Sequence, residues 1–387
     1  MIPRYSIDYN IQDLIHTLRK LTASENNSFQ SDFRNQKIFY TGSGSSALRI
    51  ILRNINLHKG DKIAIPLLTC ERVIKSILSE GFVPTFVDIS ENELLSLPRN
   101  YQQAVENDHV SAIIAISMWG YPVDIASFAQ SIDPSIPIIH DCALSPGSQL
   151  NSKEDGQNSK LAFFSYGIGK PVCLGFGGKA QLTGIPNIYD NEFLTEKNTT
   201  IIYHSVRSFI KSFLFAKEIY WLPYFLGKIV KSKDEHPFEM ENITLIPQKS
   251  LFSIELQNQK LNTRIIQARS NIIPIKRMFD ELGFTTIKED QNTEWNHWMF
   301  PVLAPRGIDA SIIQRKLVAH GFEIGLPYRR TVQLARKYWG YKNTCKNIEA
   351  NLSRIFTIPS PHQFSEKSLQ RFINVFSSLF GETYVDI

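Results

Sequence analysis

The chain has 387 residues, 43% hydrophobic and 11% aromatic, so it is long enough for two domains and can bury a substantial core. Its 42 basic and 37 acidic residues leave a formal charge of +5, an excess too small to indicate nucleic-acid binding. The four cysteines lack CxxC spacing, no apolar signal segment opens the chain, and no uncharged apolar stretch approaches the roughly 20 residues that span a bilayer. We therefore expect a cytoplasmic globular protein with reduced thiols, no metal site and no transmembrane helix.

Short β-branched runs alternate with amphipathic stretches in the first half of the chain, which is typical of a mostly parallel sheet covered by helices. The seven expected strands are residues 37–42, 62–68, 84–89, 111–117, 136–141, 161–166 and 179–183. Helices are expected at 46–55 and 71–81, and a third after Asp124, which is a typical N-cap. With connections this short, ligands should gather at the edge of the sheet.

The later chain follows a different pattern, typical of a smaller α+β unit. A helical stretch from Ser250 to Met278, interrupted by Pro274, comes first. Apolar runs at 300–305 and 353–359 and helical patterns at 310–321 and 365–380 follow it. We therefore predict three parts: an N-terminal arm over residues 1–35, a large domain over 36–250 and a small C-terminal domain over 251–387.

A glycine and serine turn, TGSGSSAL, separates the first expected strand from the first expected helix. Gly44, Ser45 and Ser46 would present backbone N–H groups at the positive end of the helix dipole, where a phosphate can bind. Similar turns open many helices that bind no ligand, so this turn alone is not specific.

Two charged residues follow the ends of expected strands. Asp141 ends IPIIHD, where its carboxylate must reach solvent or meet a positive partner, although it could equally cap the next segment. Lys170 follows the strand at 161–166 among glycines, and its amine could be a partly buried nucleophile or belong to a solvated loop. With the turn, these residues form the set that a pyridoxal phosphate enzyme needs: an amine that bonds the cofactor, a carboxylate for the pyridine nitrogen and a phosphate cradle.

In these motifs the sequence resembles the DegT/DnrJ/EryC1/StrS aminotransferases, which are fold-type-I pyridoxal phosphate enzymes acting mainly on nucleotide-linked keto-sugars. SGSSAL is similar to the family's phosphate turn, and GDKIAIPLLT, GFVPTFVDI, MWGYPVDI and IIHDCALSPGS follow in the family's order. FFSYGIGKPVCLGFGGKAQL looks like the segment that carries the Schiff-base lysine, and the region from FPVLAP to RIFTIP looks like the family's small domain. The resemblance implies an α/β fold-type-I transferase with a smaller α+β domain.

The resemblance also implies roles for individual residues. It makes Lys170 the internal aldimine lysine and the general acid and base, and Asp141 the partner of the pyridine nitrogen. The implied phosphate ligands are Gly44, Ser45, Ser46 and Ser165. The implied reaction is ping-pong transfer of an amino group from glutamate or glutamine to a nucleotide-activated keto-sugar, as in polysaccharide biosynthesis. Pyridoxal 5'-phosphate is the implied cofactor and a homodimer the implied assembly.

Two positions near the cofactor depart from the family pattern. Leu144 stands where a glutamine is usual, and Cys70 replaces an aromatic residue that stacks on the cofactor ring. Since a thiol has no aromatic face, Trp119 or Tyr166 could compensate, although core packing explains Tyr166 better. These departures keep two alternatives open: a non-catalytic binding protein with the same fold, and a pyridoxal phosphate lyase or decarboxylase.

Candidate substrate-binding residues lie in two places. Arg329 and Arg330 follow GLPY, in a segment that aligns with a substrate-facing stretch of the family. Their guanidinium groups could bind a diphosphate or a carboxylate at two points, but a solvated basic turn explains them equally well. Trp119 and Tyr328 complete the candidates.

Two histidines are expected to lie outside the site. His140 should point to the opposite face of its strand from Asp141, which indicates a structural role. His362 is expected in a surface turn.

The segment from Tyr203 to Lys233 is the largest departure from the family pattern. Its helical stripe comprises Val206, Phe209, Ile210, Phe213 and Leu214, with Arg207, Lys211 and Lys217 interleaved. Pro223 is expected to break the run. Such a stripe usually finds a protein partner, so we favour a subunit interface or packing role, with a lid or peripheral contact with a membrane as the alternatives.

Overall fold

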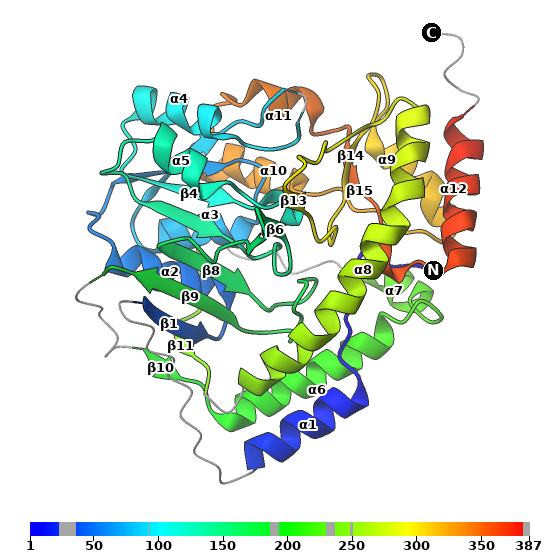
Figure 1. Ribbon diagram of the computed structural model, residues 1–387, viewed down its shortest axis with the longest axis horizontal. Coiled ribbons are helices and arrows are strands. Elements are labelled where there is room, and N and C mark those ends of the chain that lie inside the picture. The colour runs from blue at the N-terminus through cyan, green and yellow to red at the C-terminus, as the bar shows by residue number, and fades with distance from the viewer. Residues whose placement is uncertain (23–35, 92, 186–192, 230–236, 248–250, 382–387) are drawn as a thin grey trace.

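The structure is a computed structural model that describes residues 1–22, 36–91, 93–185, 193–229, 237–247 and 251–381. A nine-stranded sheet lies at its centre, in the order β10-β11-β1-β9-β8-β5-β4-β2-β3 (Figure 1). Seven consecutive strands of this sheet, up to its β3 edge, are β1 (Gln36–Thr41), β9 (Gly178–Thr183), β8 (Leu161–Ser165), β5 (Ile138–Asp141), β4 (Ala112–Ile116), β2 (Lys62–Pro66) and β3 (Val83–Val87). They coincide with the seven expected strands, so the predicted α/β fold is confirmed.

Strand direction brings several loops to one edge of this sheet. The five strands from β8 to β3 pair in parallel, whereas β9 is antiparallel to both β1 and β8. The segments that follow β1, β5 and β8 therefore leave the sheet on the same side. Two short strands that the sequence did not predict, β10 (Leu194–Thr195) and β11 (Thr244–Leu245), extend the β1 end of the sheet. Two residues are too few to show strand periodicity.

Helices lie in most of the connections between the parallel strands, whereas β5 and β8 are joined by turns and two short strands. These helices are α2 (Gly44–Asn54), α3 (Glu71–Ser79), α4 (Pro98–Asp108) and α5 (Ile125–Ser131), and a 3-10 turn, η1 (Met118–Gly120), follows β4. The Asp124 carboxylate accepts hydrogen bonds from the backbone N–H groups of Ala126 (3.1 Å) and Ser127 (3.2 Å) at the start of α5, so the expected N-cap is present.

The C-terminal part contains helices around a small antiparallel sheet. Its helices are α8 (Leu251–Glu281), α9 (Ala310–Ala319), α10 (Arg329–Tyr338), α11 (Lys346–Asn351), the 3-10 turn η3 (Pro361–Gln363) and α12 (Glu366–Phe380). Strands β12 (Thr285–Thr286), β14 (Pro301–Leu303) and β15 (Ile355–Thr357) form the sheet, and β13 (Thr293–Glu294) pairs with β6 (Gln149–Leu150), which pairs with β7 (Lys153–Glu154).

Helix α8 corrects one expectation, because it runs through Pro274 without interruption. Ile272 and Ile275 beside the proline are buried, and this packing offsets the backbone hydrogen bond that proline cannot make. One continuous apolar core cluster extends from Ile2 to Phe380 and includes residues of both the large sheet and the C-terminal part. The division into three domains therefore stays a prediction.

Helices α1 (Ile11–Thr22), α6 (Asn198–Leu214) and α7 (Trp221–Ile229) cover the edge of the molecule near β10 and the N-terminus (Figure 1). The expected break at Pro223 is wrong: the helices separate at residues 215–220, and Pro223 lies in the first turn of α7. A proline is tolerated there because N–H groups of the first turn have no helical partner. Among the described residues, no helix combines the length and apolar character that crossing a bilayer requires.

An aromatic cluster at the C-terminal end of the core should contribute strongly to stability. Phe376 is fully buried, with ring centroids 4.9 Å from Phe279, 5.3 Å from Phe284 and 4.8 Å from Phe380. Phe376→Ala leaves a cavity among these rings and should lower the free energy of unfolding by about 3–5 kcal/mol in denaturant titrations. Phe225 is 51% exposed, so Phe225→Ala is the matched control, with an expected loss below about 1 kcal/mol. Equal losses in the two variants would contradict this assignment.

Candidate functional site

Asp141 lies at the end of β5, at the sheet edge where the loops converge. Its side chain is buried, and one carboxylate oxygen accepts a hydrogen bond from the Ala143 backbone N–H (2.9 Å). Burial raises the pKa of Asp141, and the Lys170 ammonium and the Ala143 N–H lower it only in part. The site therefore holds a carboxylate whose charge is poorly compensated, and a cationic ligand would complete the compensation.

Lys170 lies in the loop between β8 and β9, near enough to Asp141 for their charges to interact. Protein groups hold the carbonyl oxygens on both sides of it. The Trp298 indole N–H donates to the Gly169 carbonyl (2.9 Å), and the Arg264 guanidinium donates to the Pro171 carbonyl (3.2 Å). Gly169 has a φ of +79°, a conformation that few residues other than glycine adopt readily. The backbone of Lys170 is thus fixed independently of any ligand.

The N-terminal arm supports this loop from behind. Asp8 pairs with Arg264 (2.7 Å), and the Ser6 hydroxyl hydrogen-bonds to the His362 ring (2.8 Å). His362 stacks on Trp298 at 4.6 Å between ring centroids, and its burial lowers its pKa to about 3. The expectation of a surface turn at His362 is corrected in part: the residue lies in the turn η3, but contacts with residues far away in the sequence leave its side chain half-buried.

The turn after β1 forms a cradle with the end of β8. Thr41 of β1 and Ser165 of β8 both pair with Gly178 of β9, which lies between them. The turn after Thr41 and the Ser165 side chain therefore lie on either side of Gly178. A Cβ atom on Gly44 would lie 2.7 Å from the Ser165 Cβ, which means that only glycine permits this approach. The N-cap of α2 closes the cradle.

Within the cradle, the Ser43 hydroxyl caps α2 by accepting a hydrogen bond from the Ser46 N–H (3.1 Å). The first-turn N–H groups of Gly44 and Ser45 point along the helix axis toward the site, where an anion is favoured. Arg72 donates to the Ser45 hydroxyl (3.2 Å) and adds positive charge. Sequence reasoning missed Arg72, although its place just after β2, a strand that ends at the same edge, was an available signal.

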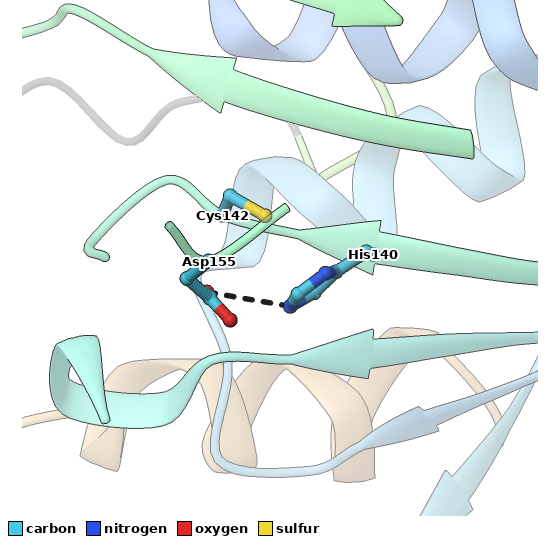
Figure 2. Close-up of side chains that lie close together, drawn as sticks. All are labelled: His140, Cys142 and Asp155. Carbon is cyan, nitrogen blue, oxygen red and sulfur yellow. Dashed lines mark ion pairs between the residues drawn. The ribbon is translucent and has the colours of Figure 1, made fainter. Parts of the chain in front are cut away.

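The opposite face of β5 carries a separate polar cluster, shown in Figure 2 with the His140–Asp155 ion pair. The two ring nitrogens of His140 lie 2.8 Å from the Ser117 and Ser159 hydroxyls, and His140 is almost fully buried. Burial opposes ionisation of Asp155, but His140 and neighbouring hydroxyls lower its pKa below the usual value. The expected structural role of His140 therefore agrees with its contacts.

The three side chains His140, Cys142 and Asp155 could place donor atoms within 4.8 Å of one another. However, both His140 nitrogens already contact hydroxyls, and burial raises the pKa of the Cys142 thiol well above its usual range. A neutral thiol and an engaged imidazole suit a hydrogen-bonded core rather than a metal centre.

Tyr328 is an aromatic residue close to Cys70, one of the two departures from the family pattern. It starts α10 with a φ of +60°, and its ring lies 5.3 Å from that of Trp119. Desolvation raises the pKa of Tyr328, and Cys70 and Asp141 act in the same direction, so both lie close to it. Trp119 itself is fully buried, with its indole N–H bonded to the Leu94 carbonyl (2.8 Å), and supports Tyr328 from behind.

The two arginines that begin α10 point to different places. Arg329 donates to the Ser353 carbonyl (2.8 Å) and lies 3.4 Å from the Asp309 carboxylate, so it connects α10 to the start of α9. Arg330 lies 3.3 Å from the Glu71 carboxylate, at the start of α3 beside Cys70, and its side chain is 49% exposed. Of the two, Arg330 is the one placed near the other candidate residues.

The remaining sequence candidates are buried. Tyr166 is 5% exposed and packs in an apolar cluster with Val172 and Ile201, which agrees with the expected core role. Leu144 is also buried, and its carbonyl accepts a hydrogen bond from the Asn296 amide (2.8 Å). The side chain that replaces the usual glutamine therefore belongs to the packing beside Asp141.

These residues fit pyridoxal phosphate. A buried carboxylate with incomplete charge compensation suits a protonated pyridine nitrogen, and Lys170 lies within electrostatic range of it. The cradle formed by the α2 N-terminus and Ser165 provides the anion site that a phosphate requires.

Comparisons with known proteins agree with this geometry. Residues 20–207 match the model of the DegT/DnrJ/EryC1/StrS aminotransferase family. A dTDP-3-amino-3,4,6-trideoxy-alpha-D-glucose transaminase from Streptomyces venezuelae is 25% identical over 48% of this chain and 50% of its own length. A GDP-perosamine synthase from Vibrio cholerae is 27% identical over 35% of this chain and 37% of its own.

Among solved structures, Spr1654 of Streptococcus pneumoniae in its PLP form superposes with a TM-score of 0.74 at 16% identity, over 98% of each chain. At that identity the likeness shows the fold. The chain spans half or less of the length of the two curated relatives. Residues 20–207, just under half of the chain, are therefore similar to the DegT/DnrJ/EryC1/StrS aminotransferase family, and the solved structure with this fold is a PLP form.

Proposed function

We propose that this protein transfers an amino group from an amino acid, glutamate or glutamine, to a keto-sugar carried by a nucleotide. One observation carries the proposal: Asp141, Lys170 and the Gly44–Ser165 cradle meet at one edge of the sheet. The two curated relatives described above are named for amino sugars linked to dTDP and GDP, which supports a nucleotide-linked acceptor.

Each residue of the site has a distinct task in this proposal. Asp141 holds the pyridine nitrogen and keeps it protonated, while the α2 N-terminus and Ser165 bind the phosphate. When bound, pyridoxal phosphate supplies a ring that stores the electron pair released at the donor Cα. The Lys170 amine moves the proton between Cα and C4′ in the first half-reaction and returns it in the second.

The side chains above the site select and enclose the substrate. Tyr328, supported by Trp119, provides an aromatic face beside Cys70, where the thiol offers none. Half of the Arg330 side chain is exposed, and among the described residues its one ion pair is with Glu71 at 3.3 Å, so it is available for a diphosphate. We retain the two-fold homodimer as a prediction that goes with this function.

Lys170→Ala tests the central assignment. The wild-type protein loaded with pyridoxal phosphate should show a visible absorption band near ~420 nm that moves toward ~330 nm when glutamate or glutamine is added. Lys170→Ala should lack this band. Lys160, an exposed lysine before β8, provides the matched control, and Lys160→Ala should behave like the wild type.

Two results would contradict these assignments. An unchanged band in Lys170→Ala would remove Lys170 from its role. A wild-type band that responds to no amino donor would favour another pyridoxal phosphate reaction or a binding protein.

The two buried aspartates on either side of β5 should respond in opposite ways to neutralisation. The pKa of Asp141 is raised in the folded protein, so above that pKa its charge costs folding free energy. Asp141→Asn should therefore leave the melting temperature of the cofactor-free protein at pH 7 unchanged or higher, while weakening cofactor binding.

Asp155→Asn is the matched comparison for Asp141→Asn. The pKa of Asp155 is lowered, so its charge stabilises the fold above the unfolded value of 3.8, and this stabilisation is lost as the pH falls through the folded pKa. Asp155→Asn should lower the free energy of unfolding at pH 7 by about 3 kcal/mol, because it removes the carboxylate charge that pairs with His140 in the buried cluster. Equal melting temperatures of the two variants would contradict the expectation that the Asp155 charge stabilises the fold and the Asp141 charge does not.

Trp298→Phe tests whether the fixed loop carbonyl matters for cofactor binding. Phenylalanine retains the stacking on His362 but cannot donate to the Gly169 carbonyl. The loss of about 1 kcal/mol should weaken pyridoxal phosphate binding about fivefold in spectroscopic titrations. Trp339→Phe, which removes a remote hydrogen bond to Pro237, is the control and should bind normally. A wild-type affinity in Trp298→Phe would show that the loop is held without this bond.

A further inference from the structure

Exposed apolar side chains are concentrated on α6 and α7. Eighteen large apolar side chains are exposed among the described residues, and nine of them lie between Tyr203 and Leu226. We call these nine the α6–α7 face: Tyr203, Val206, Ile210, Phe213, Leu214, Trp221, Leu222, Phe225 and Leu226. A patch of this density usually marks an interaction surface.

Packing of the opposite side of α6 directs this face outward. Ile201, Ser205 and Ser208 of α6 are buried, and the Ser208 hydroxyl donates to the Leu174 carbonyl (2.7 Å). The exposed residues of α6 recur every three or four positions, so they share one side of the helix. Phe209, which the sequence placed in the stripe, packs inward instead.

The turn between the two helices is also held in place. The Tyr220 hydroxyl donates to the Glu323 carboxylate (2.7 Å), and the amino group of Met1 donates to the Lys217 carbonyl (2.8 Å). Phe215 stacks on Tyr5 at 5.3 Å between ring centroids. The exposure of the α6–α7 face is therefore built into the fold.

The charge of this segment is as distinctive as its apolar character. Residues 203–233 contain six basic residues, Arg207, Lys211, Lys217, Lys228, Lys231 and Lys233, and one acidic residue, Glu218. Removing these from the totals of 42 and 37 leaves 36 of each sign in the rest of the chain. Residues 203–233 thus have a formal charge of +5, which Asp234 and Glu235 directly after them reduce to +3, so the segment that carries the apolar face is clearly basic.

We propose that the α6–α7 face docks on the surface of a membrane that contains anionic lipid. Aromatic and aliphatic side chains would enter the headgroup boundary, with Arg207 and Lys217, both exposed, facing lipid phosphates. A second copy of the chain is the poorer occupant, since a two-fold contact would place this basic segment against itself. The described helices are too short or too polar to cross the bilayer, so the contact is peripheral.

The inference is independent of the proposed aminotransfer and is tested on the full chain by vesicle cosedimentation. Vesicles of phosphatidylcholine with about one-quarter phosphatidylglycerol should retain the protein, and phosphatidylcholine alone should retain several-fold less. Raising the salt from about 50 to about 500 mM should weaken the binding. Absence of wild-type binding to the mixed vesicles would overturn the proposal.

Matched triple variants separate the face from general apolar exposure. Phe213→Ser, Trp221→Ser and Phe225→Ser together should reduce binding at least about tenfold. Ile266→Ser, Ile273→Ser and Ile312→Ser together alter exposed apolar residues elsewhere and should bind like the wild type. Thermal unfolding checks that both variants fold.

Two further outcomes would assign the face differently. Equal binding by the α6–α7 triple variant would show that another surface contacts the vesicles. A wild-type oligomer that ignores vesicles and dissociates in the α6–α7 variant would assign the face to a second copy, as light scattering would reveal.

Discussion

A buried carboxylate without a full counter-charge organises the site of this protein. Asp141 is buried at the end of β5, and its raised pKa indicates that the folded chain does not fully compensate its charge. Two other features that suit the same ligand lie nearby: the loop of Lys170, whose backbone is fixed by hydrogen bonds, and the anion cradle of Gly44 and Ser165. The cost of burying Asp141 is thus offset only when a cation joins the site.

His140, the residue before Asp141 on β5, lies on the opposite face of the strand and has a very different environment. His140 points away from Asp141 and meets Asp155, whose pKa falls because the ring and hydroxyl groups around it satisfy the carboxylate. One face of β5 is therefore complete in itself and stabilises the fold. The other face is incomplete, since the charge of Asp141 lacks a full counter-charge, which costs stability in the way that functional sites usually do.

Sequence patterns predicted the strands and the main site residues because both depend on local order: alternating runs, a glycine turn, and charges at strand ends. They could not predict Arg72 or Trp298, whose contacts with Ser45 and Gly169 depend on tertiary packing. His362 was misplaced for the same reason, since its partner Ser6 is 356 residues away. The break at Pro223 failed because the effect of proline depends on its position within a turn.

The contact between Ser6 and His362 has a consequence for the order of folding. Through Trp298, it supports the loop that presents Lys170, so one of the first residues of the chain and one of the last hold the same loop. During synthesis, the central sheet can form well before His362 leaves the ribosome. The loop of Lys170 gains this support only after His362 has been synthesised, long after the loop itself, so capture of the cofactor is expected to lag behind formation of the sheet.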